Sequence, residues 1–360
     1  MIYLDPDKVK EIVNSLYVSR ILEAYGETGV TTLRDVLETL HRLFQFIEPE
    51  LVKGSLLVFK LLDSDASPID LPNPQRFTNP QHLAQEYVID PTPRNSAIQI
   101  CSNGDLMFWK DFNLDVTQLH NRAIVYLYRD RQDAFFIREN QCIVPNPSPV
   151  YASVFSIPTF RFLRDALEDY KRRWIRTSRC RIFCTAWHGG EKSFRLFFIN
   201  GPESTMRRSL VQFLDTVFGG SAEIRPEQVV DETHPVDIKV TWMFSNRLAL
   251  IEIKWLGKSI NEEGKITQNF TDYRAKEGAQ QLADYLNTNY AEVPTHQTRG
   301  YLVVIDGRRR GLSNSSKSIS HHDGFWYEDK EITYNPAFHL TREDFEGPVR
   351  MFAEPICRAD

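Results

Sequence analysis

Alternating apolar and polar residues predict two neighbouring strands in the second half of the chain. In residues 234–240, apolar side chains at every second position flank Asp237. In residues 248–255, an apolar run leads into Glu252 and Lys254. Residues two apart in a strand share a face, so Glu252 and Lys254 point the same way. The short loop between the runs favours a hairpin that brings Asp237 onto that face.

The same patterning predicts further elements around this hairpin. Pro202 near a helix start and Gly219 near its end frame an amphipathic helix whose apolar stripe begins at Glu203. Apolar spacing of three and four residues predicts a second helix after the hairpin. In chain order, the expected elements are a helix at about 200–220, a strand at 222–225, strands at 234–240 and 248–255, a helix at 278–286 and a strand at 298–306.

The first half of the chain is predicted to be helical and then β. Helical spacing covers residues 1–62 in three helices, the first ending at Gly26 and the third formed by 51–62. Prolines make residues 63–95 loop-like. Alternation then predicts strands at 97–101, 106–109, 122–128 and 134–137.

Three prolines between 145 and 149 mark a domain boundary. We therefore expect an N-terminal domain at 1–150, of unassigned role, and a second domain at 151–360. A helix at 160–174 opens the second domain. Residues 181–183 are expected to form a strand, and the loop-rich tail one strand near 330–334.

Composition and charge narrow the class of protein. The 360 residues are 42% hydrophobic and 12% aromatic, enough for two packed cores, and the net charge of −5 argues against a protein that coats nucleic acid. Five scattered cysteines imply no disulfide framework and fit a reducing cytoplasm. The N-terminus lacks a signal-peptide pattern, and no apolar run is long enough to span a bilayer, so we expect a cytoplasmic protein with no membrane association.

Two carboxylates and a lysine on one face suit hydrolysis of phosphodiester bonds. Asp237 and Glu252, with the main-chain carbonyl of Ile253, can hold Mg²⁺ or Mn²⁺, which prefer hard oxygen ligands. Lys254 would position or deprotonate the attacking water. The alternative is a salt-bridged hairpin in which Lys254 neutralises Glu252 on a solvated face. Asp231 and Glu232 compete with Asp237 for the role of the first acid.

The run Pro-Val-Asp followed by Ile-Glu-Ile-Lys resembles the signature of the PD-(D/E)XK nuclease superfamily, the restriction-endonuclease-like fold. The resemblance covers about residues 200–310, in the order α-β-β-β-α-β, although Val236 separates Pro235 from the acid. It implies that Glu203 adds to the metal site and that Gln281, four residues before Tyr285, orients the lysine or a phosphate. It also implies an α+β fold and, for bacterial members, roles in anti-phage defence or restriction.

Two basic runs are candidate nucleic-acid-binding surfaces. Arg172, Arg173 and Arg176 surround Trp174, and Arg308, Arg309 and Arg310 follow the last core strand. The alternative for the first run is a solvated helix face paired with nearby acids. Cys180, Cys184 and His188 lack a fourth zinc ligand, and His321, His322 and Asp323 are better explained as a polar turn.

The sequence thus predicts a metal-dependent nuclease, with DNA favoured over RNA as substrate. The resemblance also allows a homo-oligomer or a defence-system partner protein. Two alternatives stay open. One is a non-catalytic nucleic-acid-binding or assembly protein, and the other is a nuclease effector that is silent until a partner or messenger binds.

Overall fold

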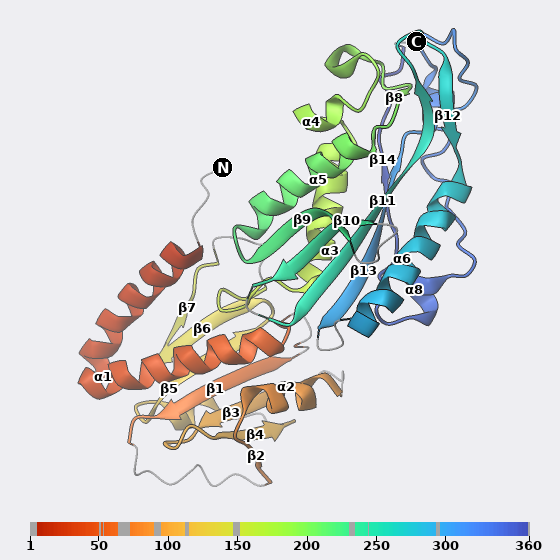
Figure 1. The fold of residues 1–360 in the computed structure, drawn as a ribbon. Helices are drawn as coiled ribbons and strands as arrows, with labels where there is room; N and C mark the ends of the chain where they lie inside the picture. The colour runs from red at the N-terminus through yellow and green to blue at the C-terminus, as the bar shows by residue number, and fades with distance from the viewer. Residues whose placement is uncertain are drawn as a thin grey trace. The chain divides into compact units, whose positions relative to one another are not determined.

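The computed structural model describes residues 6–49, 52, 54–63, 73–89, 95–111, 115–146, 152–229, 235–243, 245–292 and 296–358. The chain divides into two units, Met1–Phe162 (unit 1) and Leu163–Asp360 (unit 2). Each unit is built around a mixed sheet with helices packed against it (Figure 1). The predicted α+β class is therefore confirmed. Pro147 and Pro149, on which the predicted boundary rested, lie outside the described residues.

Unit 1 combines a long bent helix with a seven-stranded sheet. Helix α1 (Pro6–Phe46) is interrupted at Gly26, whose backbone lies at φ 67° and ψ −161°. The strand order is β2-β4-β3-β1-β5-β6-β7, with β1 and β3 parallel and the other pairs antiparallel. The elements after α1 are β1 (Ser55–Leu61), β2 (Gln75–Phe77), α2 (Pro80–Ile89), β3 (Ser96–Ile100), β4 (Leu106–Lys110), the 3₁₀ turn η2 (Val116–Leu119), β5 (Ala123–Arg129), β6 (Gln132–Ile137) and β7 (Asn140–Ile143).

The core of unit 1 lies between α1 and one face of this sheet. Leu40 and Phe44, from the predicted apolar stripe of α1, are fully buried there, and Leu37 is partly buried. The ring of Phe44 packs edge-on against Tyr128 on β5, with 5.9 Å between centroids. Helix spacing of three and four residues supplies this face, as the sequence predicts.

Two predictions for unit 1 are wrong. The run 51–62 was expected to be helical, but its described part contains strand β1, which pairs with β3 on one side and β5 on the other. A strand buried on both faces is uniformly apolar, and a short apolar run does not distinguish it from a buried helix. The region 63–95 was expected to be loop, but Pro80 begins helix α2, a position where proline is well tolerated.

Unit 2 contains the elements predicted around the hairpin. Its elements in chain order, which include unpredicted ones, are α3 (Phe160–Tyr170), which begins at the end of unit 1, the π-helical turn η3 (Lys171–Ile175), α4 (Arg181–Cys184), the 3₁₀ turn η4 (Gly190–Lys192), β8 (Phe198–Ile199), α5 (Glu203–Phe218), β9 (Ala222–Val229), β10 (Pro235–Trp242), β11 (Arg247–Ile260), β12 (Ile266–Phe270), α6 (Asp272–Glu292), β13 (Gln297–Asp306), α7 (His321–Gly324), α8 (Phe338–Thr341) and β14 (Val349–Phe352).

Strand β11 organises unit 2. It pairs antiparallel with β10 and parallel with β13 along the sheet β14-β13-β11-β10-β9, and its far end pairs with β12 and β8. Helices α5 and α6 lie on either side of this sheet (Figure 1). Leu250 and Leu302 pack against Leu282 on the α6 side, while Trp242 meets Phe218 of α5 with 5.6 Å between ring centroids.

Three local predictions for unit 2 need correction. Residues 181–183 form the first turns of helix α4, not a strand, and the Cys180 side chain accepts the hydrogen bond that begins this helix. Residues 330–334 form no strand. Strand β14 was not predicted; it pairs with the buried β13 and supplies its outer neighbour.

Candidate functional site

The β10–β11 hairpin brings Asp237 close to Glu252, which lies on the face of β11 that α6 covers. Ile238 pairs with Ile251 in antiparallel register, so Asp237 and Glu252 are the next residues beyond the end of this ladder. Their charges interact. Burial raises the pKa of Glu252 to about 7, and the Asp237 carboxylate acts in the same direction, while Lys254 opposes both. The predicted convergence of two acids and a lysine is present in the structure.

Glu252 and Lys254 form a buried ion pair on this face. The Lys254 Nζ donates to Glu252 Oε1, and the two residues are 6% and 3% exposed. The second oxygen, Glu252 Oε2, is buried and has no hydrogen-bond partner among the described residues. Leaving a buried acceptor unpaired costs roughly 1–3 kcal/mol. This oxygen is therefore open to a ligand.

Asp237 has both carboxylate oxygens engaged. Its Oδ2 accepts from the Ile253 main-chain N–H at 2.8 Å, and its Oδ1 accepts from Arg207 Nη1 at 2.7 Å. Burial raises the pKa of Asp237, while the bond from Ile253 and the charges of Lys254 and Arg207 oppose that rise. Arg207 lies on α5 and also bonds Glu227 on β9. A cation at Asp237 would therefore compete with Arg207.

Glu203 reaches the site through an arginine. It begins α5 and accepts from Arg274 Nη2 at 3.3 Å. The Arg274 charge also lowers the pKa of Glu252, so this guanidinium acts on both acids. Arg274 stacks over the Phe270 ring at 5.0 Å and approaches Glu277 at 3.5 Å. The structure joins Glu203 to the site indirectly, without a contact to Asp237.

Helix α6 packs directly over Lys254. A Cβ built on Gly278 would lie 2.5 Å from Lys254 Cγ and 3.0 Å from its Cε, so only a glycine allows this approach. Gln281 is three residues further along α6 and hence on the same face. Its side-chain oxygen Oε1 is buried and has no hydrogen-bond partner among the described residues. The predicted Gln281 thus joins Glu252 in presenting an unpartnered buried oxygen.

The oxygen donors present suit a hard cation, but arginine side chains already engage two of the acids. Carboxylate, amide and main-chain oxygens are the ligands that Mg²⁺ takes. Within the described residues, no group of three or more His, Cys, Asp or Glu side chains is assembled as a metal site. Asp237 is held by Arg207, and Glu203 by Arg274. Two oxygens without partners among the described residues, Glu252 Oε2 and Gln281 Oε1, are open to a ligand, whereas Asp237 Oδ1 and Glu203 are engaged by arginines.

The two arginines were missed by the sequence reasoning. Arg207 follows Glu203 by four residues on α5, and Arg274 precedes Gly278 by four on α6. Residues four apart share a helix face, so both lie on the faces that carry Glu203 and Gln281. A search for basic residues one turn from the predicted acids would have found them. Asp231 and Glu232, the competing acids, lie outside the described residues.

The first predicted nucleic-acid-binding run is exposed but paired. Arg172 and Arg173 are 71% and 62% exposed, and both approach Asp169 Oδ1, at 3.4 and 2.7 Å. Arg176 pairs with Glu328 and Glu354. The run lies on the π-helical turn η3, a rare conformation. These pairs fit the alternative of a solvated, neutralised face, and binding to nucleic acid stays a prediction.

The second predicted run divides into buried and exposed members. Arg308 is buried and bonds Asp306 and Asp272. Arg309 is 5% exposed, and its guanidinium donates to the main-chain carbonyl oxygens of Arg308, Arg195 and Ala353. Burial lowers the pKa of Arg309 to about 9. The guanidinium groups of Arg308 and Arg309 are engaged inside unit 2, whereas Arg310 is about half exposed; contact of this run with nucleic acid stays a prediction.

The cysteine and histidine clusters do not form metal sites in the described residues. Cys180 Sγ lies 3.1 Å from Ser209 Oγ, whereas the Cys184 thiol donates to the Ser178 carbonyl oxygen. His321 begins the short helix α7, which Ser320 caps. Both clusters are explained by local hydrogen bonding.

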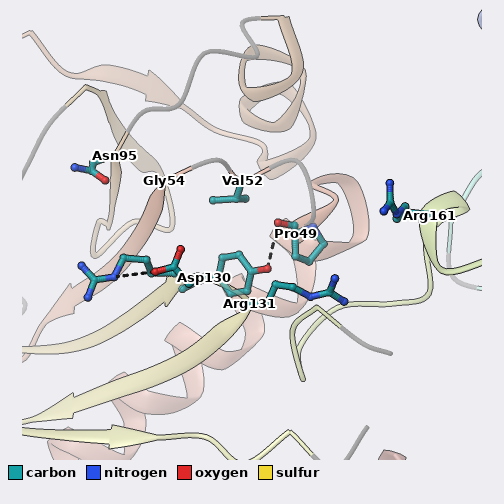
Figure 2. Close-up of a pocket in the computed structure, with 9 residues that line it drawn as sticks. Pro49, Val52, Gly54, Asn95, Asp130, Arg131 and Arg161 are labelled. Atoms are coloured by element: carbon teal, nitrogen blue, oxygen red, sulfur yellow. Dashed lines mark hydrogen bonds and ion pairs between the residues drawn. The ribbon is translucent and has the colours of Figure 1, made fainter. Parts of the chain in front are cut away.

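A separate pocket of about 480 Å³ lies in unit 1 (Figure 2). Arg129, Arg131 and Arg161 contribute to its lining. The Tyr128 hydroxyl donates to the Pro49 carbonyl oxygen at 3.2 Å, and Arg129 lies 3.9 Å from the Asp130 carboxylate. This basic, open pocket lacks the paired buried acids of unit 2, so the candidate catalytic site is the one on β10 and β11.

The interpretation of the site rests on its own geometry. Across the described residues, no helix combines the length and apolar content that crossing a bilayer requires. No protein-family model, curated protein or solved structure matches the chain.

Proposed function

We propose that unit 2 is a metal-dependent nuclease that hydrolyses phosphodiester bonds, with DNA favoured over RNA. The observation that carries the proposal is Glu252 Oε2, a buried carboxylate oxygen without a partner, beside Asp237 and Lys254. A buried acid with a pKa near 7 and a charged neighbour is typical of functional sites. A buried carboxylate oxygen without a partner is explained by a bound ion, a water or a catalytic role.

The metal would be Mg²⁺ or Mn²⁺, held by Asp237, Glu252 and the Ile253 main-chain carbonyl, with Glu203 near by. When bound, it would lower the pKa of a water and polarise the phosphate. Glu252 loses its proton near neutral pH and so becomes a carboxylate ligand in that range. The set of hard oxygen donors supports this choice over zinc, which prefers nitrogen and sulfur.

Lys254 and Gln281 would act on the reacting groups. Lys254 is fixed between Glu252 and Gly278, so its ammonium group is preorganised to stabilise charge that develops on the phosphate. The unpartnered Gln281 Oε1 would accept from the attacking water and orient it. Arg207 and Arg274, released from Asp237 and Glu203, would turn to the phosphate, for which a guanidinium has the matching geometry.

The wider role rests on the resemblance to the PD-(D/E)XK superfamily. The element order from α5 through β9, β10 and β11 to α6 and β13 supports a restriction-endonuclease-like core. A function in bacterial anti-phage defence or restriction, in the cytoplasm and with a homo-oligomeric or defence-system partner, follows from that resemblance alone.

The closed state of the acids favours two other functions. Arg207 on Asp237 and Arg274 on Glu203 are the contacts expected of a non-catalytic nucleic-acid-binding or assembly protein whose acids are structural. The same contacts are expected of a nuclease held silent until a partner or messenger moves the arginines. Calorimetric titration with Mn²⁺ separates these, because a purely structural ion pair takes up no metal.

Cleavage assays with Mg²⁺ or Mn²⁺ test the proposal on single-stranded DNA, duplex DNA and RNA. Lys254→Met, Asp237→Asn and Glu252→Gln should each reduce cleavage at least about 10²-fold. Lys258→Met is the matched control: Lys258 lies on the same strand and bonds the Leu312 carbonyl oxygen at 2.6 Å, outside the site. Its cleavage rate should match that of the wild type.

Three results would count against the proposal in different ways. Equal activity in all variants refutes the assignment of residues. A wild-type protein that does not cleave nucleic acid and does not bind Mn²⁺ refutes the nuclease function itself. Mn²⁺ binding without cleavage selects the silent effector, and an Arg207→Ala variant should then bind Mn²⁺ more tightly.

A further inference from the structure

A cluster of basic groups surrounds a half-buried tryptophan in the segment after β13. The Arg310 guanidinium lies 4.1 Å from the centroid of the Trp326 ring, and Lys330 Nζ lies 3.8 Å from it. The His322 ring meets Trp326 edge-on at 5.2 Å. We name Arg310, His322, Trp326 and Lys330 the Trp326 cluster.

The charges of this cluster are available at the surface. Arg310 is 48% exposed and forms an ion pair with Asp323 at 3.7 Å, which is itself 40% exposed. Lys330 is exposed, and no described carboxylate lies within 4.0 Å of its ammonium group. Asp323 also faces His322, at 3.4 Å. The cluster therefore carries two exposed cations, Arg310 and Lys330, although the exposed acids Asp329 and Glu331 flank Lys330 in sequence.

A continuous series of contacts links the cluster to the candidate site. Lys330 Nζ lies 5.3 Å from the centroid of the Tyr327 ring, and Arg308 lies 4.6 Å from the same centroid. Arg308 in turn bonds Asp272, the first residue of α6. Arg274, two residues later, contacts Glu203 and influences Glu252. The cluster thus lies on the side of unit 2 where α6 begins.

We propose that the Trp326 cluster binds single-stranded nucleic acid and guides it to the candidate site. The inference rests on the proposed nuclease function, whose substrate it narrows. One unpaired base would stack on the Trp326 ring, and Arg310 and Lys330 would move from that ring to the flanking phosphates. Aromatic rings interleaved with cations bind single strands because every base has a stacking face and every linkage carries a charge. A duplex keeps its bases stacked on one another, so it offers the ring nothing equivalent.

Anisotropy of labelled oligonucleotides of about 12 residues, a length that spans one site of this kind, tests the binding in EDTA. Trp326→Leu should weaken binding of the single strand about tenfold, the effect of losing one stacked base. Replacing Arg310 and Lys330 with Ala should weaken it and reduce the salt slope by about 0.7 for each charge. Tyr290→Leu, at an exposed aromatic position near the end of α6, should have no effect. Thymidine and uridine oligomers distinguish DNA from RNA, and circular dichroism confirms that each variant is folded.

The outcomes separate this inference from the nuclease proposal, because no metal is present. Equal binding by wild type and Trp326→Leu overturns the inference, as does an equal loss for duplex and single strand. A loss on Trp174→Leu in place of Trp326→Leu assigns binding to the η3 turn and also overturns it. Binding that depends on Trp326, together with no cleavage or Mn²⁺ uptake by the wild type, supports the surface and refutes the nuclease.

Discussion

Substituting alanine at Gly278 is the sharpest test of the site's geometry. The added Cβ would lie 2.5 Å from Lys254 Cγ, 3.0 Å from Lys254 Cε and 3.1 Å from Leu302 Cδ1. Lys254 has little room to move, because it is buried and its ammonium group bonds Glu252. The substitution therefore forces apart α6 and the strand that carries the site.

Two opposing terms set the expected magnitude. Alanine is favoured over glycine inside a helix by roughly 1 kcal/mol. Overpacking a buried position costs roughly 1–3 kcal/mol. With the nearest contact at 2.5 Å, the second term should prevail, and Gly278→Ala should lower the free energy of unfolding by about 1 kcal/mol. Misplacement of Lys254 should also reduce cleavage about 10²-fold.

The effect of Gly278→Ala on the free energy of unfolding should change sign when Lys254 is replaced. Lys254→Ala removes Cγ and Cε, leaving the Leu302 methyl as the close neighbour at 3.1 Å. In that background, Gly278→Ala should be neutral or stabilising by up to about 1 kcal/mol, the helix-propensity term. The two substitutions should thus couple by about 1–2 kcal/mol.

Urea unfolding followed by tryptophan fluorescence measures this cycle. Trp109 is the one tryptophan outside unit 2, so the signal reports mainly on unit 2. Gly347→Ala is the matched control, since its Cβ would meet only Arg164 Nη1, at 3.9 Å, and should show no coupling to Lys254→Ala. Additivity of the Gly278 and Lys254 effects, or a Gly278→Ala protein more stable than the wild type, would refute the packing of Lys254 against α6.

Further predictions concern the charged groups. Burial raises the pKa of Glu252 from its ordinary 4.5 to about 7, so the folded state binds more protons than the unfolded state between these values. The free energy of unfolding should therefore fall by up to about 3 kcal/mol as the pH rises through that interval, and Glu252→Gln should flatten the curve from urea titrations. Under the proposed function, Mn²⁺ affinity should rise with pH up to about 7, with proton release seen in calorimetry in buffers of different ionisation enthalpy. Arg207→Ala should reduce stability in EDTA by about 2 kcal/mol, because it leaves Asp237 unpaired, and Mn²⁺ should restore more stability to it than to the wild type. Arg309→Met should lower stability by about 3 kcal/mol, because buried carbonyl oxygens lose their donor, whereas Arg310→Met should change it little; equal effects in thermal unfolding would contradict the burial of Arg309.

The order of elements in unit 2 could be predicted because local rules decide it. Pro202 and Gly219 flank α5 at helix-compatible positions, and period-two alternation identifies β10. The pairing of Glu252 with Lys254 also followed from strand periodicity. These inferences need only neighbours in sequence. They would hold for any packing of the same segments.

The errors fall where an apolar run is short or a partner is distant in sequence. Strand β1 was taken for a helix because its alternate residues are buried in two core clusters, which makes the run apolar throughout. Strand β14 was missed because it is formed by pairing with β13, which is distant in sequence. The run from Arg308 to Arg310 was taken as one surface. Arg308 is buried, however, where it bonds Asp306, and Arg309 is buried where it bonds the Ala353 carbonyl oxygen. The composition of a segment does not indicate which residues distant in sequence will contact it.

By itself, the sequence determined which residues share a strand or helix face, since a fixed backbone period projects side chains in fixed directions. It therefore determined that Asp237, Glu252 and Lys254 could meet. Only the tertiary structure decided how the acids are neutralised: Arg207 and Arg274 come from helices on either side of the sheet, and their approach depends on packing. It also decided the protonation of Glu252, because desolvation is a property of everything that surrounds the carboxylate and not of the carboxylate's own segment.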